Sequence, residues 1–226
     1  MKFLRKYVNG DIPGNLSSRL RRKRSLLFLN YINSIEIKNP KIIDIGGYHN
    51  YWLQLNSYFN SNLSPVLLNI SKGWIMDNKF TSIVADGKDL ACIKDKSFDV
   101  AFSNSVIEHI SNFEDQQEMI NNIKRISKYY FIQTPAFVFP IEPHFLFPFF
   151  HRLPVKVRIW LVRHFDLGWF RETKCYDEAK KLVKSIRIMK KKELKLLVKT
   201  AIIITEKIFH LSKSYMLTNL KIWKKS

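Results

Sequence analysis

Glycine and polar residues that can bind a small molecule follow several short apolar runs of this sequence. They are Asp44, Gly46, Gly47, Asn69, Asp86, Ser103 and Asn104. In an open α/β sheet, ligands bind at the carboxyl ends of the strands, near the point where the strand order reverses. Adjacent glycines let the backbone approach a ligand closely, and the free N–H groups of a following helix attract an anionic group. We therefore expect a binding site at this edge of a sheet.

A second group of candidates contains histidines. Glu142, His144 and His151 lie within the aromatic, proline-rich segment TPAFVFPIEPHFLFPFFHRLP (134–154), and His109 lies within VIEHI. An unperturbed imidazole titrates near neutrality, so His144 is the first candidate for a general base and His109 the second, with Glu142 as a further polar group. Their spacing matches no metal-ligand motif, and we expect no metal. The aromatic side chains suit a substrate lid that binds sugar faces or lipid tails, or else a flap packed on the sheet edge.

The elements that position these groups alternate between strands and helices. Apolar runs predict strands at 41–45, 65–70, 81–85, 98–102 and 129–134. Helical spacing predicts helices at 17–37, 50–59, 113–127, 154–165, 176–184 and 191–197, with RRKR (21–24) on the polar side of the first. A strand is also expected at 187–189, and a final strand at 201–208. This alternation favours a parallel sheet covered by helices on both faces.

Composition and charge limit the class of protein. The 226 residues are 46% hydrophobic, which predicts one globular domain, and two cysteines are too few for a disulfide framework. The net charge of +19 is uneven, because residues 1–30 and 151–226 hold 28 of the 38 Lys and Arg but 7 of the 19 Asp and Glu. The first 14 residues lack the apolar core of a secretion signal, and prolines interrupt the longest apolar stretch, 131–154. We expect a cytoplasmic protein.

Four segments carry a resemblance to a known family. They are IIDIGGYHNYW (42–52), VADGKDL (84–90), SFDVAFSNSVIEHI (97–110) and the aromatic segment extended to 130–154. The series resembles the class I S-adenosylmethionine (SAM)-dependent methyltransferases, and within them the type 11 group of bacterial cell-surface polysaccharide pathways. The tail 189–215 is similar to the family's last helix and hairpin strand.

The resemblance implies a fold and a chemistry. The fold is a Rossmann-like, mostly parallel seven-stranded sheet with helices on both faces and an antiparallel last strand. It would form a single domain, 1–226, with a basic helical segment at 1–38 and a lid insertion at 135–185. The activity is methyl transfer from SAM to a small-molecule or lipid-linked glycan acceptor, and the basic ends suggest peripheral contact with an anionic membrane.

The resemblance also assigns roles to residues. Gly46 and Gly47 let the backbone approach SAM, Asp44 accepts from its ammonium group, and Asn69 lies where the family places an acidic residue on the ribose. Asp86 accepts from the adenine amino group, and Ser103 and Asn104 line the floor beneath the methyl group. The sequence departs from the family pattern at Tyr48 and Asn50, which occupy later glycine positions of the first motif. At Asn69 a neutral hydrogen bond replaces a charge-assisted one of about twice the strength.

Two other classes remain as alternatives. A nicotinamide dehydrogenase needs G-x-G-x-x-G, but Tyr48 and Tyr51 occupy the second and third glycine positions counted from Gly46, and Asn69 lacks the expected carboxylate. The other alternative is a degenerate methyltransferase fold whose basic ends bind RNA or anionic membrane. No aromatic-basic RNA-binding motif is visible, which argues against a nucleic-acid partner.

Overall fold

A seven-stranded sheet forms the centre of the protein. The computed structural model describes residues 14–71 and 79–221. The strands are β1 (Ile42–Ile45), β2 (Val66–Asn69), β3 (Ser82–Val84), β4 (Phe98–Asn104), β5 (Ser127–Pro135), β6 (Ile202–Ile208) and β7 (Leu211–Thr218). Their order is β3-β2-β1-β4-β5-β7-β6, with β7 antiparallel to both of its neighbours and the other pairs parallel. The strand order therefore reverses between β1 and β4.

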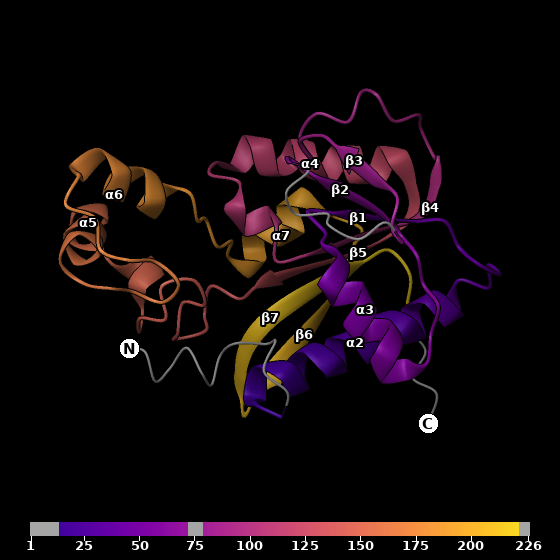
Figure 1. The fold of residues 1–226 in the computed structure, drawn as a ribbon, viewed down its shortest axis with the longest axis horizontal. Coiled ribbons are helices and arrows are strands. Elements are labelled where there is room, and N and C mark those ends of the chain that lie inside the picture. The colour runs from indigo at the N-terminus through magenta and orange to yellow at the C-terminus, as the bar shows by residue number, and fades with distance from the viewer. Residues whose placement is uncertain (1–13, 72–78, 222–226) are drawn as a thin grey trace.

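Helices cover both faces of this sheet (Figure 1). One face packs against α2 (Leu16–Ser34) and α3 (His49–Phe59), where Phe28, Tyr31 and Trp52 are fully buried. The other packs against α4 (Phe113–Ile126) and α7 (Lys191–Leu197), through side chains such as Ile120 and Leu194. Every residue of β1 is buried, as a central strand covered on both faces requires. The predicted mostly parallel α/β sheet is confirmed.

Side-chain caps fix where two of these helices begin. Asn15 accepts a hydrogen bond from the Ser18 N–H before α2, and Asn112 accepts one from the Asp115 N–H before α4. α2 ends at Ser34, short of the predicted residue 37, because Glu36 has φ +53°. A left-handed residue cannot continue a right-handed helix.

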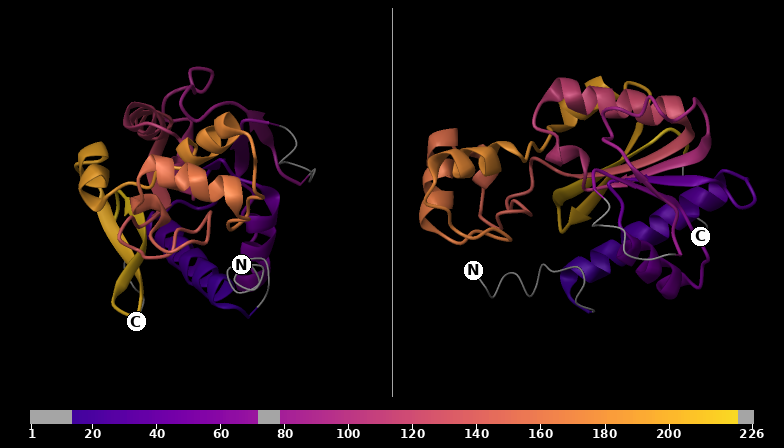
Figure 2. Two further views of the ribbon diagram at one scale, coloured as in Figure 1. Left: turned by 90° about the vertical axis from the view of Figure 1, so that its left-hand side faces the viewer. Right: turned by 45° about the horizontal axis from the view of Figure 1, so that its top comes forward.

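A long excursion leaves the sheet after β5, and we call residues 136–188 the excursion. It contains the 3₁₀ turn η3 (Phe150–Arg152), α5 (Val155–His164) and α6 (Tyr176–Lys184). Figures 1 and 2 show α5 and α6 standing beside the sheet. The excursion has an apolar cluster of its own, which includes Phe145, Phe150 and Val183. It is anchored at the carboxyl end of β5, the edge where the binding site was expected.

The structure corrects two predictions near the C-terminus. Residues 187–189 form no strand, because the Arg187 N–H donates to the Glu108 carbonyl outside the sheet. The strand predicted at 201–208 is present as β6 but is not the last. Phe209, with φ +51°, begins the turn into β7, which inserts between β5 and β6. A non-glycine residue in this conformation gives no turn signal in the sequence.

Part of the basic α2 surface is folded against the sheet. Arg24 pairs with Glu206 of β6 at 2.9 Å, and both side chains are nearly buried. Lys213 of β7 lies 3.7 Å from the same carboxylate. The expectation that RRKR lies wholly on the polar side is therefore wrong at Arg24. Residues 1–13 of the basic N-terminal end lie outside the described residues.

Candidate active site

Both glycines after β1 are required by the local geometry. Gly46 has φ +76°, and its N–H donates to the Leu68 carbonyl of β2 at 2.7 Å. A Cβ on Gly47 would collide with the Asp44 carboxylate, which lies directly beneath the turn. The chain can therefore pass closely over Asp44 and enter α3 at His49.

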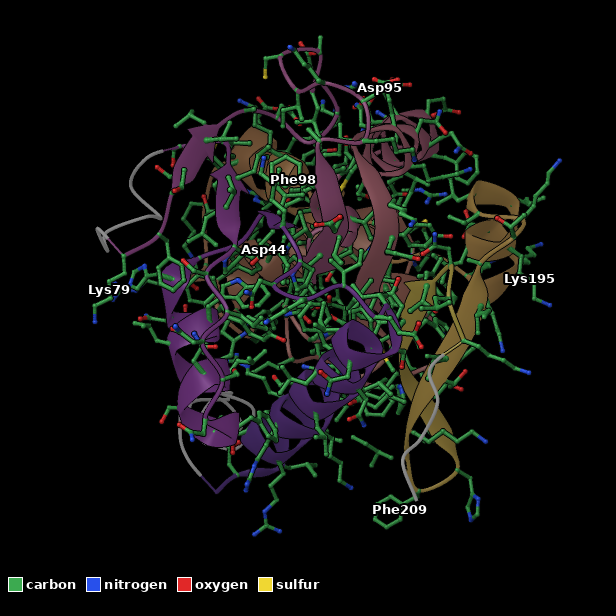
Figure 3. The ribbon with its side chains drawn as sticks, turned by 90° about the vertical axis from the view of Figure 1, so that its right-hand side faces the viewer. Asp44, Lys79, Asp95, Phe98, Lys195 and Phe209 are labelled. Carbon is green, nitrogen blue, oxygen red and sulfur yellow. The ribbon has the colours of Figure 1, made fainter. Side chains whose placement is uncertain are left out.

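Asp44 is a buried carboxyl group with a neutral partner. Its Oδ2 accepts a hydrogen bond of 2.7 Å from Trp52 Nε1. Burial raises the pKa of Asp44 from 3.8 to about 8, although the Trp52 hydrogen bond acts in the opposite direction. Figure 3 shows Asp44 in the interior, near the end of β1. A cationic ligand group at this position would stabilise the carboxylate, which fits the ammonium group of SAM.

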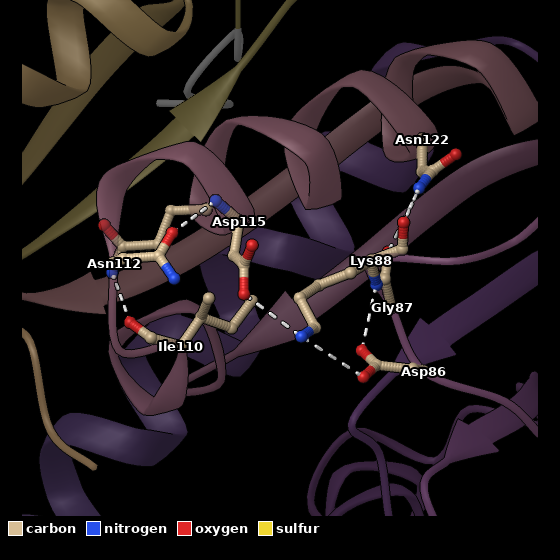
Figure 4. A network of polar contacts seen from close by, with 8 residues as sticks. Asp86, Gly87, Lys88, Ile110, Asn112, Asp115 and Asn122 are labelled. Carbon is tan, nitrogen blue, oxygen red and sulfur yellow. Dashed lines mark hydrogen bonds and ion pairs between the residues drawn. The ribbon is translucent and has the colours of Figure 1, made fainter. Parts of the chain in front are cut away.

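Asn69 ends β2, and Asp86 follows β3 at the same edge of the sheet. Asn69 Nδ2 donates to the Gly47 carbonyl at 3.2 Å, and its Oδ1 accepts from the Ile70 N–H. The Asp86 carboxylate accepts from the Lys88 N–H at 3.0 Å (Figure 4). Lys88 Nζ also lies 3.7 Å from Asp86 and 3.1 Å from Asp115. The amide of Asn69 thus holds the glycine turn, and Asp86 belongs to an exposed ion-pair network.

Ser103 and Asn104 end β4 beside β1. Ser103 is fully buried, and its hydroxyl donates to the Ile45 carbonyl at 3.2 Å. Asn104 is half-buried. The chain then turns at Ser105, with φ +57°, and the Val106 side chain fills the space over Gly46. These residues form the floor between the two strands where the order reverses.

The predicted catalytic residues come together beside this floor. His109 ends the 3₁₀ turn η2 (Ile107–His109), and its ring meets that of His144 edge-to-face at 4.7 Å between centroids. His144 Nδ1 is 2.6 Å from Glu142 Oε1. Glu142 Oε2 accepts from the N–H groups of His144 and Phe145 at 2.9 and 2.5 Å. Glu142 is thereby fixed, and it fixes His144.

Sequence reasoning missed Glu108 as a member of this cluster. Glu108 is completely buried, and its Oε2 accepts from Thr134 Oγ1 at 3.2 Å. Its adjacency to His109 in VIEHI was the available signal. His151 has a different partner, since its Nε2 is 2.7 Å from the Phe137 carbonyl.

Burial and mutual charge shift the pKa values of the cluster. Burial raises the pKa of Glu108 to about 7. Loss of surrounding water and the neighbouring His144 lower the pKa of His109 to about 4. For His144, burial lowers the pKa, but the hydrogen bond and charge of Glu142 outweigh it, and the pKa is raised above 6.5. The pKa values of the two histidines are therefore shifted in opposite directions.

A cavity of about 520 Å³ lies next to the cluster. Residues of the excursion form most of its wall, and Ser111, two residues beyond His109, forms the rest. Its other lining residues are Phe137, His151, Arg158, Val183, Lys184, Ile186, Arg187 and Ile188. The lining is mainly basic and apolar.

Comparison with known sequences identifies a domain in this region. Residues 45–129 match the family model described as "Methyltransferase domain". The uncharacterized proteins MT1557 and Rv1509 of Mycobacterium tuberculosis are 35% identical over 72 residues, which cover 32% of this chain and 24% of each relative. The chain thus matches about a quarter of the length of these curated relatives. The predicted methyltransferase resemblance is confirmed for the matched domain.

Solved structures share the fold. The PH0226 protein from Pyrococcus horikoshii OT3 has a TM-score of 0.53 at 15% identity, covering 96% of this chain and 97% of that chain. A SAM-dependent methyltransferase from Archaeoglobus fulgidus has a TM-score of 0.52 at 13% identity, covering 88% and 93%. The predicted Rossmann-like methyltransferase fold is confirmed. The domain match and the fold together support a SAM-dependent methyltransferase.

Proposed function

We propose that this chain, with its methyltransferase domain at 45–129, uses S-adenosyl-L-methionine to methylate a hydroxyl group of a small-molecule acceptor. One observation carries the proposal. The η2 segment joins the two halves of the site. Val106 packs over Gly46. Three residues later, the His109 ring contacts the His144 ring. Groups suited to the cofactor and groups suited to proton transfer therefore share one edge of the sheet.

Residues at the ends of β1 to β4 would hold the cofactor. Asp44 would accept from the ammonium group, and the glycine turn with the first N–H groups of α3 would receive the carboxylate. Asn69 would contact the ribose, Asp86 the adenine amino group, and Ser103 and Asn104 the reacting end. When bound, SAM supplies an electrophilic methyl group on a sulfonium sulfur.

His144 is the better placed of the two candidate bases. Glu142 holds its Nδ1, which leaves Nε2 to accept a proton from the acceptor hydroxyl. The imidazolium that forms is stabilised by the same carboxylate. His109, with its pKa near 4, is a weaker proton acceptor and serves better to orient His144.

We assign the acceptor to this cavity, which is lined mainly by the excursion. The excursion then corresponds to the lid predicted at 135–185, within a single domain. Phe137 can stack on a sugar ring, while Arg158 and Lys184 can bind hydroxyl or acidic groups. This lining favours a glycan acceptor, in keeping with a polysaccharide pathway.

The outer face of α5 favours an acceptor linked to lipid. Val157, Trp160 and nearby Phe165 are exposed, Trp160 by 53%, and Lys156 lies among them. Exposed aromatic and cationic side chains on one helix are typical of contact with an anionic membrane surface. None of the described helices is long and apolar enough to cross a membrane. We propose peripheral docking at the cytoplasmic leaflet.

Calorimetric titration tests the proposed function. SAM and S-adenosylhomocysteine should bind the full chain, and NAD should not. Binding of NAD alone would indicate the dehydrogenase alternative. If none of the three binds, while the chain sediments with RNA or with anionic vesicles, the degenerate binding protein is the correct interpretation.

A further inference from the structure

Three side chains of the cluster are arranged like ligands of one ion. Glu108, His109 and His144 each offer one ligand atom, and these atoms all lie within 4.8 Å of one another. Donors about 2.0–2.2 Å from one ion are at most about 4.4 Å apart, so small side-chain rotations would complete the site. The first two ligands come from η2, and the third is held by the excursion.

An unpaired buried oxygen points independently to a cation. Glu108 is 0% exposed, and its Oε1 has no hydrogen-bond partner within the described part of the chain. Such an atom loses its water without compensation, which is costly for a carboxylate. A metal ion at the cluster would supply the missing partner. The methyl-transfer scheme above gives Glu108 no other role.

The surroundings of His144 match those of a metal-bound histidine. Such residues commonly direct their second ring nitrogen at a carboxylate, which fixes the ring and strengthens the ligand. Glu142 occupies that position on Nδ1, leaving Nε2 for an ion. The main chain is also held, because the His144 carbonyl accepts from the Trp169 N–H at 3.1 Å and a Cβ on Gly168 would collide with it.

We propose that Glu108, His109 and His144 bind one divalent transition-metal ion, with Glu142 orienting His144. Two imidazoles and one carboxylate favour Zn²⁺, Mn²⁺ or Fe²⁺ over Mg²⁺ and Ca²⁺. This proposal departs from the sequence-based expectation of no metal.

The role of the ion rests on the proposed function. Three protein ligands leave coordination positions open for an acceptor hydroxyl. Coordination lowers the pKa of that hydroxyl, so its O–H bond breaks, the proton passes to water and the electron pair stays on the oxygen. In this form His144 Nε2 is a ligand, and proton removal no longer depends on it.

Direct metal titration tests the site without reference to activity. The full chain is freed of metal with EDTA, dialysed and titrated with Zn²⁺, Mn²⁺, Co²⁺ and Mg²⁺ by calorimetry. We expect one transition-metal ion per chain, with Mg²⁺ at least about 100-fold weaker. Co²⁺ should give visible absorption bands that require the two histidines.

Variants locate the ion. Glu108→Gln, His109→Ala and His144→Ala should each weaken Zn²⁺ binding at least about 100-fold, and Glu142→Gln should weaken it about 10- to 100-fold. His164→Ala is the control, since this exposed histidine at the end of α5 lies outside the cluster. Glu108→Gln keeps the side-chain volume, and thermal unfolding in EDTA establishes that each variant is folded. Binding that survives both Glu108→Gln and His144→Ala, or no binding at millimolar metal, overturns the proposal.

The same samples separate this inference from the proposed function. SAM is titrated into the EDTA-treated chain. Binding of SAM without binding of metal rejects the metal site and leaves His144 as the base. Binding of metal without binding of SAM retains the metal site and rejects the methyltransferase.

Discussion

Asp44→Asn should stabilise the ligand-free protein in a pH-dependent manner. The Asp44 carboxyl is buried under the glycine turn, and it accepts a hydrogen bond from the neutral Trp52 indole. Because burial raises its pKa from 3.8 to about 8, the folded state keeps it protonated while the unfolded state ionises it. The stability that Asp44 provides is therefore fully present below about pH 4 and is lost as the pH rises toward 8. Asparagine has a similar shape and does not ionise.

The size of the effect follows from the shift in pKa. A difference of one pKa unit between the folded and unfolded states corresponds to about 1.4 kcal/mol of unfolding free energy. Between pH 5 and pH 8, ionisation of Asp44 in the unfolded state should remove on the order of 4 kcal/mol from the unfolding free energy of the wild type. The Asp44→Asn protein should not lose this amount. Its advantage over the wild type should therefore be on the order of 4 kcal/mol larger at pH 8 than at pH 5.

Urea unfolding at both pH values, followed by circular dichroism, measures the effect. Asp95→Asn is the matched control, because that carboxyl group is 73% exposed in a surface pair with Arg125. The control should differ from the wild type by less than about 0.5 kcal/mol at either pH. If the Asp44→Asn advantage changes by less than about 0.5 kcal/mol between the two pH values, the carboxyl is not desolvated as argued.

Three further predictions concern function. A hydrogen bond to a charged group contributes about 1.5–3 kcal/mol, so Asp44→Asn should weaken SAM binding by roughly 10- to 150-fold in calorimetry, and Asp86→Ala by less. Unchanged affinity in Asp44→Asn would remove its assigned role. His144→Ala should lower turnover about 10²- to 10⁴-fold with SAM affinity nearly unchanged, whereas an equally active variant would show His144 to be structural. Sedimentation should show that the chain binds anionic vesicles but not neutral ones. Salt and Trp160→Ala should weaken this binding, whereas the control Leu196→Ala on α7 should not. Equal binding to both vesicle types would refute docking.

The sequence by itself determined most of the local structure. The runs ending at Ile45 and Phe102 are apolar because their strands are covered on both faces, and burial of this kind is visible in composition. The helices at 176–184 and 191–197 match the prediction residue for residue, since their apolar spacing reports one buried face. The glycine pair indicated the turn after β1 because the geometry at Gly46 and Gly47 leaves no room for other residues.

Tertiary structure alone decided how distant residues meet. Glu108 and Thr134 are 26 positions apart, and their contact depends on β4 and β5 pairing in parallel. His144 reaches His109 only because the excursion folds back toward η2. β7 lies between β5 and β6, and the turn that leads into it contains no glycine that would predict it from the sequence. Periodicity records which side chains are buried, whereas strand order and the path of a loop decide what they are buried against.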